Sequence, residues 1–159
     1  MILVLLGTFP TQFQRPLVEL DKLCEKGLIK EEVIVQSGHT EFDSNYLTLR
    51  PFMSTSDLLE LYEKARIVIS HAGSGSILKG VKLGKKVIAI PRLAKFGEVV
   101  DDHQLEILKE FEELGYLIPW YDTDELIDLL AKAEKFVPNP YVSKKQQIID
   151  YLDDYISGI

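Results

Sequence analysis

The sequence contains a single cysteine, one tryptophan and two methionines among its 159 residues. One cysteine cannot form an internal disulfide, so the chain is not a disulfide-stabilised scaffold, and Cys24 in an apolar-periodic stretch favours a reducing compartment. No apolar run approaches the roughly 18–20 residues needed to cross a bilayer, because residues 1–6 are followed by Gly7, Thr8 and Pro10. We therefore expect a cytoplasmic chain that does not anchor itself in a membrane.

A basic stripe is also missing. The net charge is −7, and residues 1–97 carry 13 Lys/Arg and 10 Asp/Glu, whereas residues 98–159 carry 5 and 15. Nucleic-acid binding depends largely on neutralising phosphates, so this charge pattern argues against a nucleic-acid partner. If the chain binds an anion, local geometry must provide the attraction.

Aliphatic runs alternate with amphipathic stretches along the chain. The expected strands are 2–6, 32–36, 46–50, 67–69, 86–90 and 116–118. The expected helices are 14–25, one capped by Ser54 or Ser56, one ending at Leu83, 101–114, 123–133 and 143–157. This alternation predicts one α/β domain over residues 1–159, with a mainly parallel sheet and helices on both faces. Ligands on such sheets bind beyond the carboxyl ends of the strands.

The most informative segment is 70–76, where a buried strand runs into small residues that open a helix. Free N–H groups and the positive end of the helix dipole favour a phosphate there, and Gly73 and Gly75 leave room for its approach. Ser74 and Ser76 add hydroxyl donors. The alternative is a tight turn in which a serine only caps the helix. The dinucleotide fingerprint fails because position 78 is leucine, and the P-loop and hydrolase-elbow patterns are absent.

Two further polar segments precede expected helices. His103 and Gln104, in the segment 101–104, can hydrogen-bond sugar hydroxyls or phosphate, although the alternative is a capped and solvated first turn. The segment 122–124 has the Asp-x-Asp pattern of some metal sites. Because Glu125 follows Asp122 by three residues, just before an apolar run, we interpret Asp122 as a helix cap and expect no metal site.

The chain contains, in this order, Gly7-Thr8, Pro51-Phe52, the run 67–76, Gly84-Lys85, Pro91 and His103-Gln104. Together these segments resemble the nucleotide-sugar-binding half of glycosyltransferase family 28, and in particular the small subunits of two-part enzymes. Those are the eukaryotic dolichol-linked GlcNAc transferase and bacterial capsule or exopolysaccharide β-1,4-glycosyltransferases. The resemblance covers nearly the whole chain, and 7–18 and 96–104 lean towards the bacterial branch.

The resemblance implies a Rossmann-like GT-B half that binds a UDP-sugar, most readily UDP-Gal or UDP-GlcNAc, without a metal or another cofactor. One departure is Lys79, which replaces a carboxylate that holds the ribose in the peptidoglycan member of the family. The implied donor-binding residues are Gly7, Thr8, Ser37, Gly38, Phe52, His71, Gly73, Ser74, Gly75, Ser76, His103 and Gln104.

The resemblance also implies inversion by direct displacement, in which a base activates the acceptor hydroxyl. His71 and Glu98 are weak candidates, His39 and Asp102 lie in other suitable loops, and the partner chain is another source. The catalytic residue is therefore not identified from the sequence.

A single GT-B half implies a membrane-anchored partner subunit that binds a lipid-linked saccharide acceptor. The chain is expected to act as a hexosyltransferase only with this partner, at the inner face of the membrane, in capsule or exopolysaccharide synthesis. The alternatives are a non-catalytic UDP-sugar-binding or enhancer subunit and a sugar epimerase. The helix 143–157 is the expected docking element, unless it packs on the chain's own sheet. Its apolar stripe consists of Ile148, Ile149, Leu152, Tyr155, Ile156 and Ile159.

Overall fold

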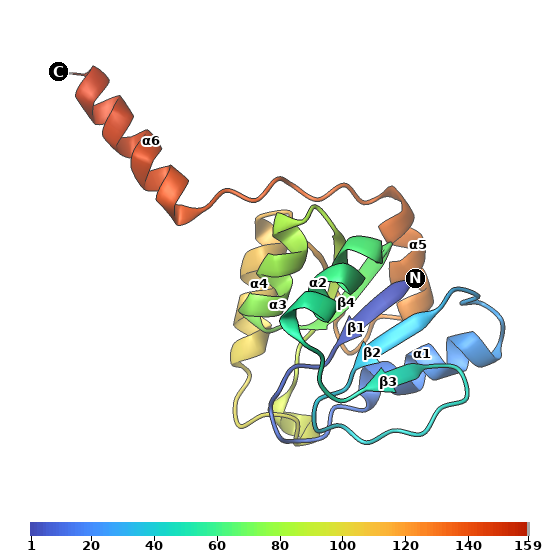
Figure 1. Cartoon of the computed structure of the whole chain (residues 1–159). Helices are drawn as coiled ribbons and strands as arrows, with labels where there is room; N and C mark the ends of the chain where they lie inside the picture. Colours follow the sequence, from blue (N-terminus) through green and yellow to red (C-terminus); the bar gives the residue numbers. More distant parts are fainter. Residues whose placement is uncertain (159) are drawn as a thin grey trace.

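A computed structural model of the chain describes residues 1–158, apart from the side chains of 144–148, 150 and 151. Within these residues a six-stranded sheet has the order β3-β2-β1-β4-β5-β6, and every pairing is parallel (Figure 1). The strands are β1 (Ile2–Leu5), β2 (Val33–Gln36), β3 (Thr48–Arg50), β4 (Ile67–His71), β5 (Lys86–Ile90) and β6 (Ile118–Pro119). The expected strands therefore all form, with small differences at their ends.

Helices lie in every connection between consecutive strands except that between β2 and β3, and they cover both faces of the sheet (Figure 1). They are α1 (Arg15–Glu25), α2 (Thr55–Lys64), α3 (Ser74–Lys82), α4 (His103–Glu113), α5 (Leu126–Lys135) and α6 (Lys144–Ser157), with a short 3-10 turn, η1 (Ala94–Phe96). Ser54 caps α2 as expected, because its hydroxyl accepts a hydrogen bond from the Asp57 amide at 3.1 Å. The alternation of strands and helices therefore gave the correct fold class.

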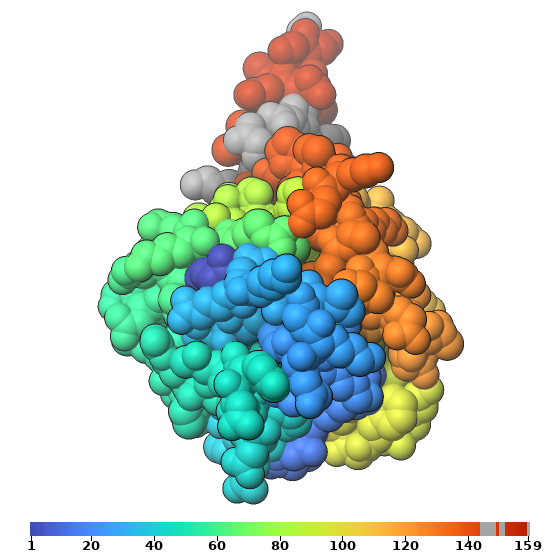
Figure 2. Space-filling model, turned by 90° about the vertical axis from the view of Figure 1, so that its right-hand side faces the viewer, coloured from blue at the N-terminus to red at the C-terminus, as the bar shows by residue number. Residues whose placement is uncertain are grey.

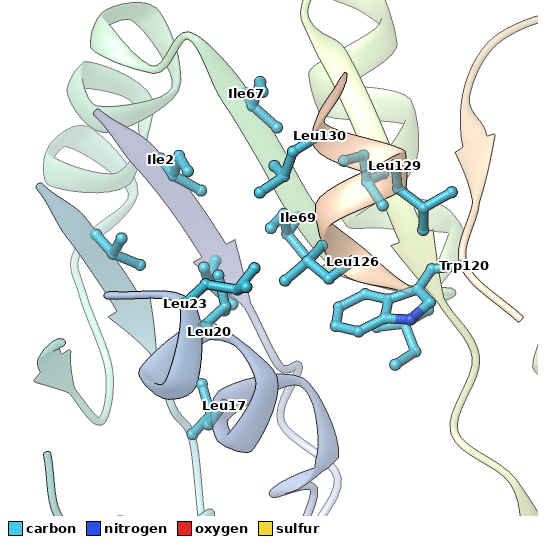
Figure 3. Packing of buried hydrophobic residues seen from close by; sticks show 14 of the residues in the cluster. Ile2, Leu17, Leu20, Leu23, Ile67, Ile69, Trp120, Leu126, Leu129 and Leu130 are labelled. Atoms are coloured by element: carbon cyan, nitrogen blue, oxygen red, sulfur yellow. The ribbon is translucent and has the colours of Figure 1, made fainter. Parts of the chain in front are cut away.

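The central strand β1 shows why the sheet is covered on two sides. Its side chains alternate between the faces, and all four are buried. Ile2 and Val4 face α1 and α5, whereas Leu3 and Leu5 belong to the core under α2, α3 and α4. Figure 3 shows the first of these cores, in which leucines of α1 and α5 meet Ile2, Ile67, Ile69 and Trp120.

The strand order places a topological switch point between β1 and β4. The chain leaves β1 towards β2 on one side and leaves β4 towards β5 on the other. The two connections diverge there, and ligands of open α/β sheets bind in the crevice that such a divergence leaves outside the carboxyl edge. Gly7, just beyond β1, and His71, the last residue of β4, meet at this point: a Cβ atom at Gly7 would lie 2.8 Å from the His71 ring.

Helix α6 projects from the rest of the molecule at the end of an extended segment (Figure 1). Figure 2 shows its red residues standing clear of the surface formed by the sheet and its covering helices. Ile149 and Leu152 are 40% and 48% exposed, and Tyr155 and Ile156 are both 64% exposed. The structure therefore does not show this helix packed on its own sheet. Two positions of the expected stripe, Ile148 and Ile159, lie outside the described side chains.

The expected cap of α5 is wrong. Helix α5 begins at Leu126 with Glu125 in the cap position, and no side chain caps it. The Asp122 carboxylate instead pairs with the Lys95 ammonium group, which holds the pKa of that carboxyl below its usual range. The helix begins three residues later than the capping pattern requires, so Asp122 is too far from its first turn to cap it.

Candidate functional site

The start of α3 presents unpaired backbone donors at the switch point. Gly73 is the cap residue, with extended backbone and no side-chain hydrogen bond. The amides of Ser74, Gly75 and Ser76 occupy the first helical turn, and no acceptor for them lies among the described residues. Ser74 and Gly75 are exposed, so these N–H groups can reach a ligand. Together with the positive end of the helix dipole, they form a suitable site for a phosphate group.

Burial of Tyr62 fixes the direction of this first turn. The Tyr62 hydroxyl donates a 3.0 Å hydrogen bond to the carbonyl oxygen of Ser76. The tyrosine is almost fully buried, and this burial raises its pKa to about 12. The hydroxyl therefore stays protonated and anchors the helix start to α2.

The imidazole of His71 fills the crevice between two glycines. A Cβ atom at Gly73 would lie 2.1 Å from His71 Cε1, and one at Gly7 would also collide with the ring. The His71 ring therefore leaves no room for a side chain at position 73, whereas a Cβ at Gly75 would meet nothing within 4 Å. Burial, and next the charge of Arg92, lower the pKa of His71 to about 4, so the ring is neutral at pH 7.

The low pKa of His71 predicts an acid-sensitive fold. Between pH 6.5 and about 4 the unfolded chain binds a proton at this ring that the folded chain does not bind. The free energy of unfolding should therefore fall as the pH falls through this window, by about 2–3 kcal/mol from this residue. Urea denaturation at pH 7 and pH 4.5 measures the change. The His71→Asn variant should lose this part of the pH dependence; an identical dependence in both proteins would contradict the assignment.

The start of α4 brings Gln104 to the same crevice. Its side-chain Oε1 accepts a 2.9 Å hydrogen bond from the Arg92 amide, and its Nε2 lies 3.5 Å from His71 Nδ1. His103 lies differently, because its ring is 68% exposed and pairs with Glu106 on the same helix. The structure therefore places Gln104 beside His71, and His103 on the solvent side of the helix start.

The loop after β2 closes the crevice on another side. Gly38 has a φ of +57°, and a Cβ atom there would lie 2.4 Å from the carbonyl oxygen of Gly7. Its neighbour Ser37 is buried and lines a cavity of about 610 Å³. Phe52, just beyond β3, is 54% exposed, and its ring stands edge-on to His39 with centroids 5.5 Å apart. Thr8, after Gly7, is exposed at the same edge.

Glu98 is engaged inside the protein. Its carboxylate accepts two 2.8 Å hydrogen bonds from the Arg15 guanidinium and one of 3.0 Å from the Leu93 amide, and its side chain is only 4% exposed. This arrangement favours a structural role for Glu98 over a catalytic one. Asp102 accepts a hydrogen bond from the Ala94 amide, which likewise organises the loop before α4.

The sequence interpretation missed Arg92 and Arg15 as parts of this edge. Arg92 is 1% exposed although it lies in a loop after Pro91, and its guanidinium reaches the carbonyl oxygens of Leu6 and Thr11. The only sequence signal for Arg92 was its position just after an aliphatic strand and Pro91. This position does not predict where the side chain points.

Within the described part of the chain, no three His, Cys, Asp or Glu side chains gather as a metal site would require. No helix in residues 1–158 combines the length and apolar character needed to span a membrane.

The sequence is similar to those of known proteins. The sequence matches the glycosyltransferase family 28 C-terminal domain over residues 1–155. It is similar to the UDP-N-acetylglucosamine transferase subunit ALG13 of Yarrowia lipolytica, with 30% identity over 159 residues, 91% of this chain and 79% of the relative. The protein of the same name from Candida albicans is 31% identical over 117 residues, 74% of this chain and 36% of that protein. The chain thus spans between about a third and four-fifths of the length of these relatives.

Solved structures show the same fold. The crystal structure of the glycosyltransferase of kitacinnamycin has a TM-score of 0.58 and 18% identity, with 83% of this chain and 33% of that chain covered. The NMR structure of ALG13 has a TM-score of 0.56 and 20% identity, with 95% and 93% covered. The expected Rossmann-like fold of a GT-B half is confirmed. On the family match and the similarity to the Yarrowia subunit together, the chain belongs to the glycosyltransferase family 28 C-terminal domain family.

Proposed function

We propose that this chain is the UDP-sugar-binding subunit of an inverting glycosyltransferase. The observation that carries the proposal is the set of three backbone amides, from Ser74 to Ser76, in the first turn of α3 at the β1/β4 switch point, on residues that are exposed or half-exposed. A diphosphate at this helix start would receive N–H donors and the field of the helix dipole. The same groups would stabilise the negative charge that develops on UDP as it leaves the sugar, without a metal ion.

The donor sugar is proposed to lie near Gln104 and His103. Gln104 is held by the Arg92 amide, so its Nε2 is oriented towards the crevice beside His71. An oriented side-chain amide can distinguish sugars by their hydroxyl or acetamido groups. Because the relatives are named UDP-N-acetylglucosamine transferase subunits, UDP-GlcNAc is the donor we favour over UDP-Gal.

A partner is proposed to supply the base and bind the acceptor. Glu98 is paired with Arg15, and a pKa of about 4 makes the imidazole of His71 a weak proton acceptor at pH 7. The relatives are themselves named as subunits. We therefore propose a membrane-anchored partner that presents a lipid-linked saccharide and recruits this chain to the inner face of the membrane.

Helix α6 is proposed as the element that docks on this partner. Its apolar residues Ile149, Leu152, Tyr155 and Ile156 are at least 40% exposed and recur at helical spacing. The helix also projects from the sheet and the helices that cover it, which together form the nucleotide-binding body. A partner can therefore cover the apolar stripe of α6 without displacing part of the core (Figures 1 and 2).

The biosynthetic setting is a separate part of the proposal. Capsule or exopolysaccharide synthesis is favoured by the sequence resemblance of residues 7–18 and 96–104 to the bacterial branch. The similar proteins described above come from fungi, and their names do not extend to this setting. The transfer assay should therefore include a lipid-linked acceptor from capsule or exopolysaccharide synthesis.

A non-catalytic UDP-sugar-binding or enhancer subunit is the second candidate. It is favoured by the internal pairing of Glu98 and the low pKa of His71, which leave neither of these two groups well suited to deprotonate an acceptor. In this case the catalytic groups would all lie on the partner.

Isothermal titration calorimetry with UDP and a panel of UDP-sugars tests the donor site. The panel contains the GlcNAc, galactose, glucose and glucuronic acid derivatives, with GDP as the control. We expect saturable binding of UDP and stronger binding of UDP-GlcNAc than of the other sugars. Transfer to a lipid-linked acceptor should then require both this chain and a membrane fraction containing the partner.

The outcomes separate the candidates. UDP-sugar binding without partner-dependent transfer would favour the non-catalytic role. Loss of transfer in a His71→Asn variant that still binds the UDP-sugar with unchanged affinity would favour the catalytic role. Absence of UDP binding would contradict both proposals.

A further inference from the structure

Arg92 is the most deeply buried cation at the carboxyl edge of the sheet. It follows Pro91 directly after β5, and only 1% of its surface is exposed. A guanidinium group withdrawn from water carries a large desolvation cost unless hydrogen-bond acceptors surround it. Burial accordingly lowers the pKa of Arg92. The acceptors that offset this cost show what the side chain holds together.

The guanidinium joins the loop after β1 to the loop after β5. Its Nη2 donates a 2.8 Å hydrogen bond to the carbonyl oxygen of Leu6, the residue before Gly7. Its Nη1 donates to the carbonyl oxygen and hydroxyl of Thr11 at 3.2 and 3.1 Å, and to the carbonyl oxygen of Glu98 at 3.2 Å. The Phe13 ring packs against the same group, with its centroid 4.7 Å from Cζ. One planar guanidinium group therefore holds together two loops that are far apart in the sequence.

The backbone of Arg92 extends this connection to the helix starts. Its amide donates a 2.9 Å hydrogen bond to Gln104 Oε1, and the Nε2 of the same side chain lies 3.5 Å from His71 Nδ1. The His71 ring in turn contacts the positions of Gly7 and Gly73. Arg92 is thus linked to the segments after β1, β4 and β5, which together carry most of the proposed donor site.

The charges around Arg92 are not balanced within this network. The Glu98 carboxylate pairs with Arg15, whereas Arg92 bonds to the backbone carbonyl oxygen of Glu98 and has no salt bridge among the described residues, so its positive charge is not neutralised by a direct ion pair. The Nε atom of Arg92 is also the only fully buried side-chain nitrogen or oxygen without a partner among the described residues. The positive charge of Arg92 acts on the switch point, because it contributes to the lowered pKa of His71.

We propose that Arg92 is a positioning residue of the donor site. Its guanidinium group holds the loops after β1 and β5 in a fixed position relative to the start of α3, and it keeps a positive charge beneath the diphosphate. The inference rests on the proposed function, because it names the device that shapes the proposed UDP-sugar site. Arg92 does not touch the ligand; it acts through Leu6, Thr11 and Gln104.

The test compares UDP with uridine, which lacks the diphosphate. In the Arg92→Met variant the affinity for UDP should fall about ten-fold or more, whereas the affinity for uridine should change by less than about three-fold. The Arg92→Lys variant keeps a charge but cannot reach Leu6, Thr11 and the Glu98 carbonyl oxygen together, so it should restore UDP binding only in part. The imidazole pKa of His71, measured by NMR, should rise in Arg92→Met and provides a readout independent of ligand.

The matched control is Arg66→Met. Arg66 also joins segments that are distant in sequence, because it pairs with Glu31 and Glu134, but it lies at the opposite edge of the sheet, before β4. This variant should bind UDP as the unaltered chain does. Circular dichroism and thermal unfolding establish that each variant is folded.

Unchanged UDP affinity in folded Arg92→Met and Arg92→Lys would overturn the role of Arg92, as would an equal loss for UDP and uridine. If Arg92→Met does not fold, Arg92→Lys and Thr11→Val decide the matter, and wild-type UDP affinity in both would overturn the role. Failure of the unaltered chain to bind UDP would instead contradict the proposed function itself.

Discussion

Replacing Gly75 with leucine should abolish UDP binding while the fold persists. A Cβ atom at this position meets nothing within 4 Å, and leucine is a better helix former than glycine by about 0.5–1 kcal/mol. Side chains on a helix tilt towards its N-terminus, so a leucine in the first turn of α3 would lie over the exposed amides. We expect at least a 100-fold loss of UDP affinity, measured by calorimetry, with the free energy of unfolding unchanged or slightly raised.

Two alanine variants provide the controls for this prediction. Gly75→Ala adds a single methyl group in open space, so it should keep most of the UDP affinity and all of the stability. Gly73→Ala places a Cβ 2.1 Å from His71 Cε1, so the ring or the turn must shift and the chain should lose about 1–3 kcal/mol of stability. Full UDP affinity in Gly75→Leu would show that the ligand does not use the start of α3.

The contrast between these two glycines shows what the sequence could predict about the site. A strand followed by small residues indicates a helix start with free amides, and this reasoning located the candidate site without tertiary information. The same reasoning gave Gly73 and Gly75 one role, which was to leave room for a phosphate to approach the helix start. The structure separates them, because the crowding at Gly73 comes from the side chain of His71, whose direction depends on the ring being held against Gly7 and Gln104.

Long-range polar contacts account for what the sequence could not predict. Arg92 reaches Leu6 across 86 positions, and Arg15 reaches Glu98 across 83. Both contacts exist because parallel strands bring all their carboxyl ends to one edge, with β1 one strand removed from β5. Periodicity identifies the strands but not their order, so the loops that would meet were not known.

Removal of residues 143–159 should abolish association with the proposed membrane-anchored partner and leave UDP binding intact. The cut preserves the segment that closes the nucleotide-binding body: the ring of Tyr141 contacts Tyr116, and the Val142 amide bonds to the Tyr116 hydroxyl at 3.4 Å. The lost helix carries an exposed apolar stripe and projects from that body (Figure 1). Burial of such a stripe contributes about 1.5–3 kcal/mol for each large apolar side chain, which is enough to determine binding.

Co-purification of the truncated chain with the partner from detergent-solubilised membranes measures this effect. The double variant Ile149→Asp and Ile156→Asp should also lose association, because it places two charges on the apolar stripe of α6. The matched change Asp153→Asn alters a neighbouring exposed residue of the same helix and should retain the partner. Equal retention of the truncated chain, with UDP affinity unchanged, would place the docking surface on the nucleotide-binding body.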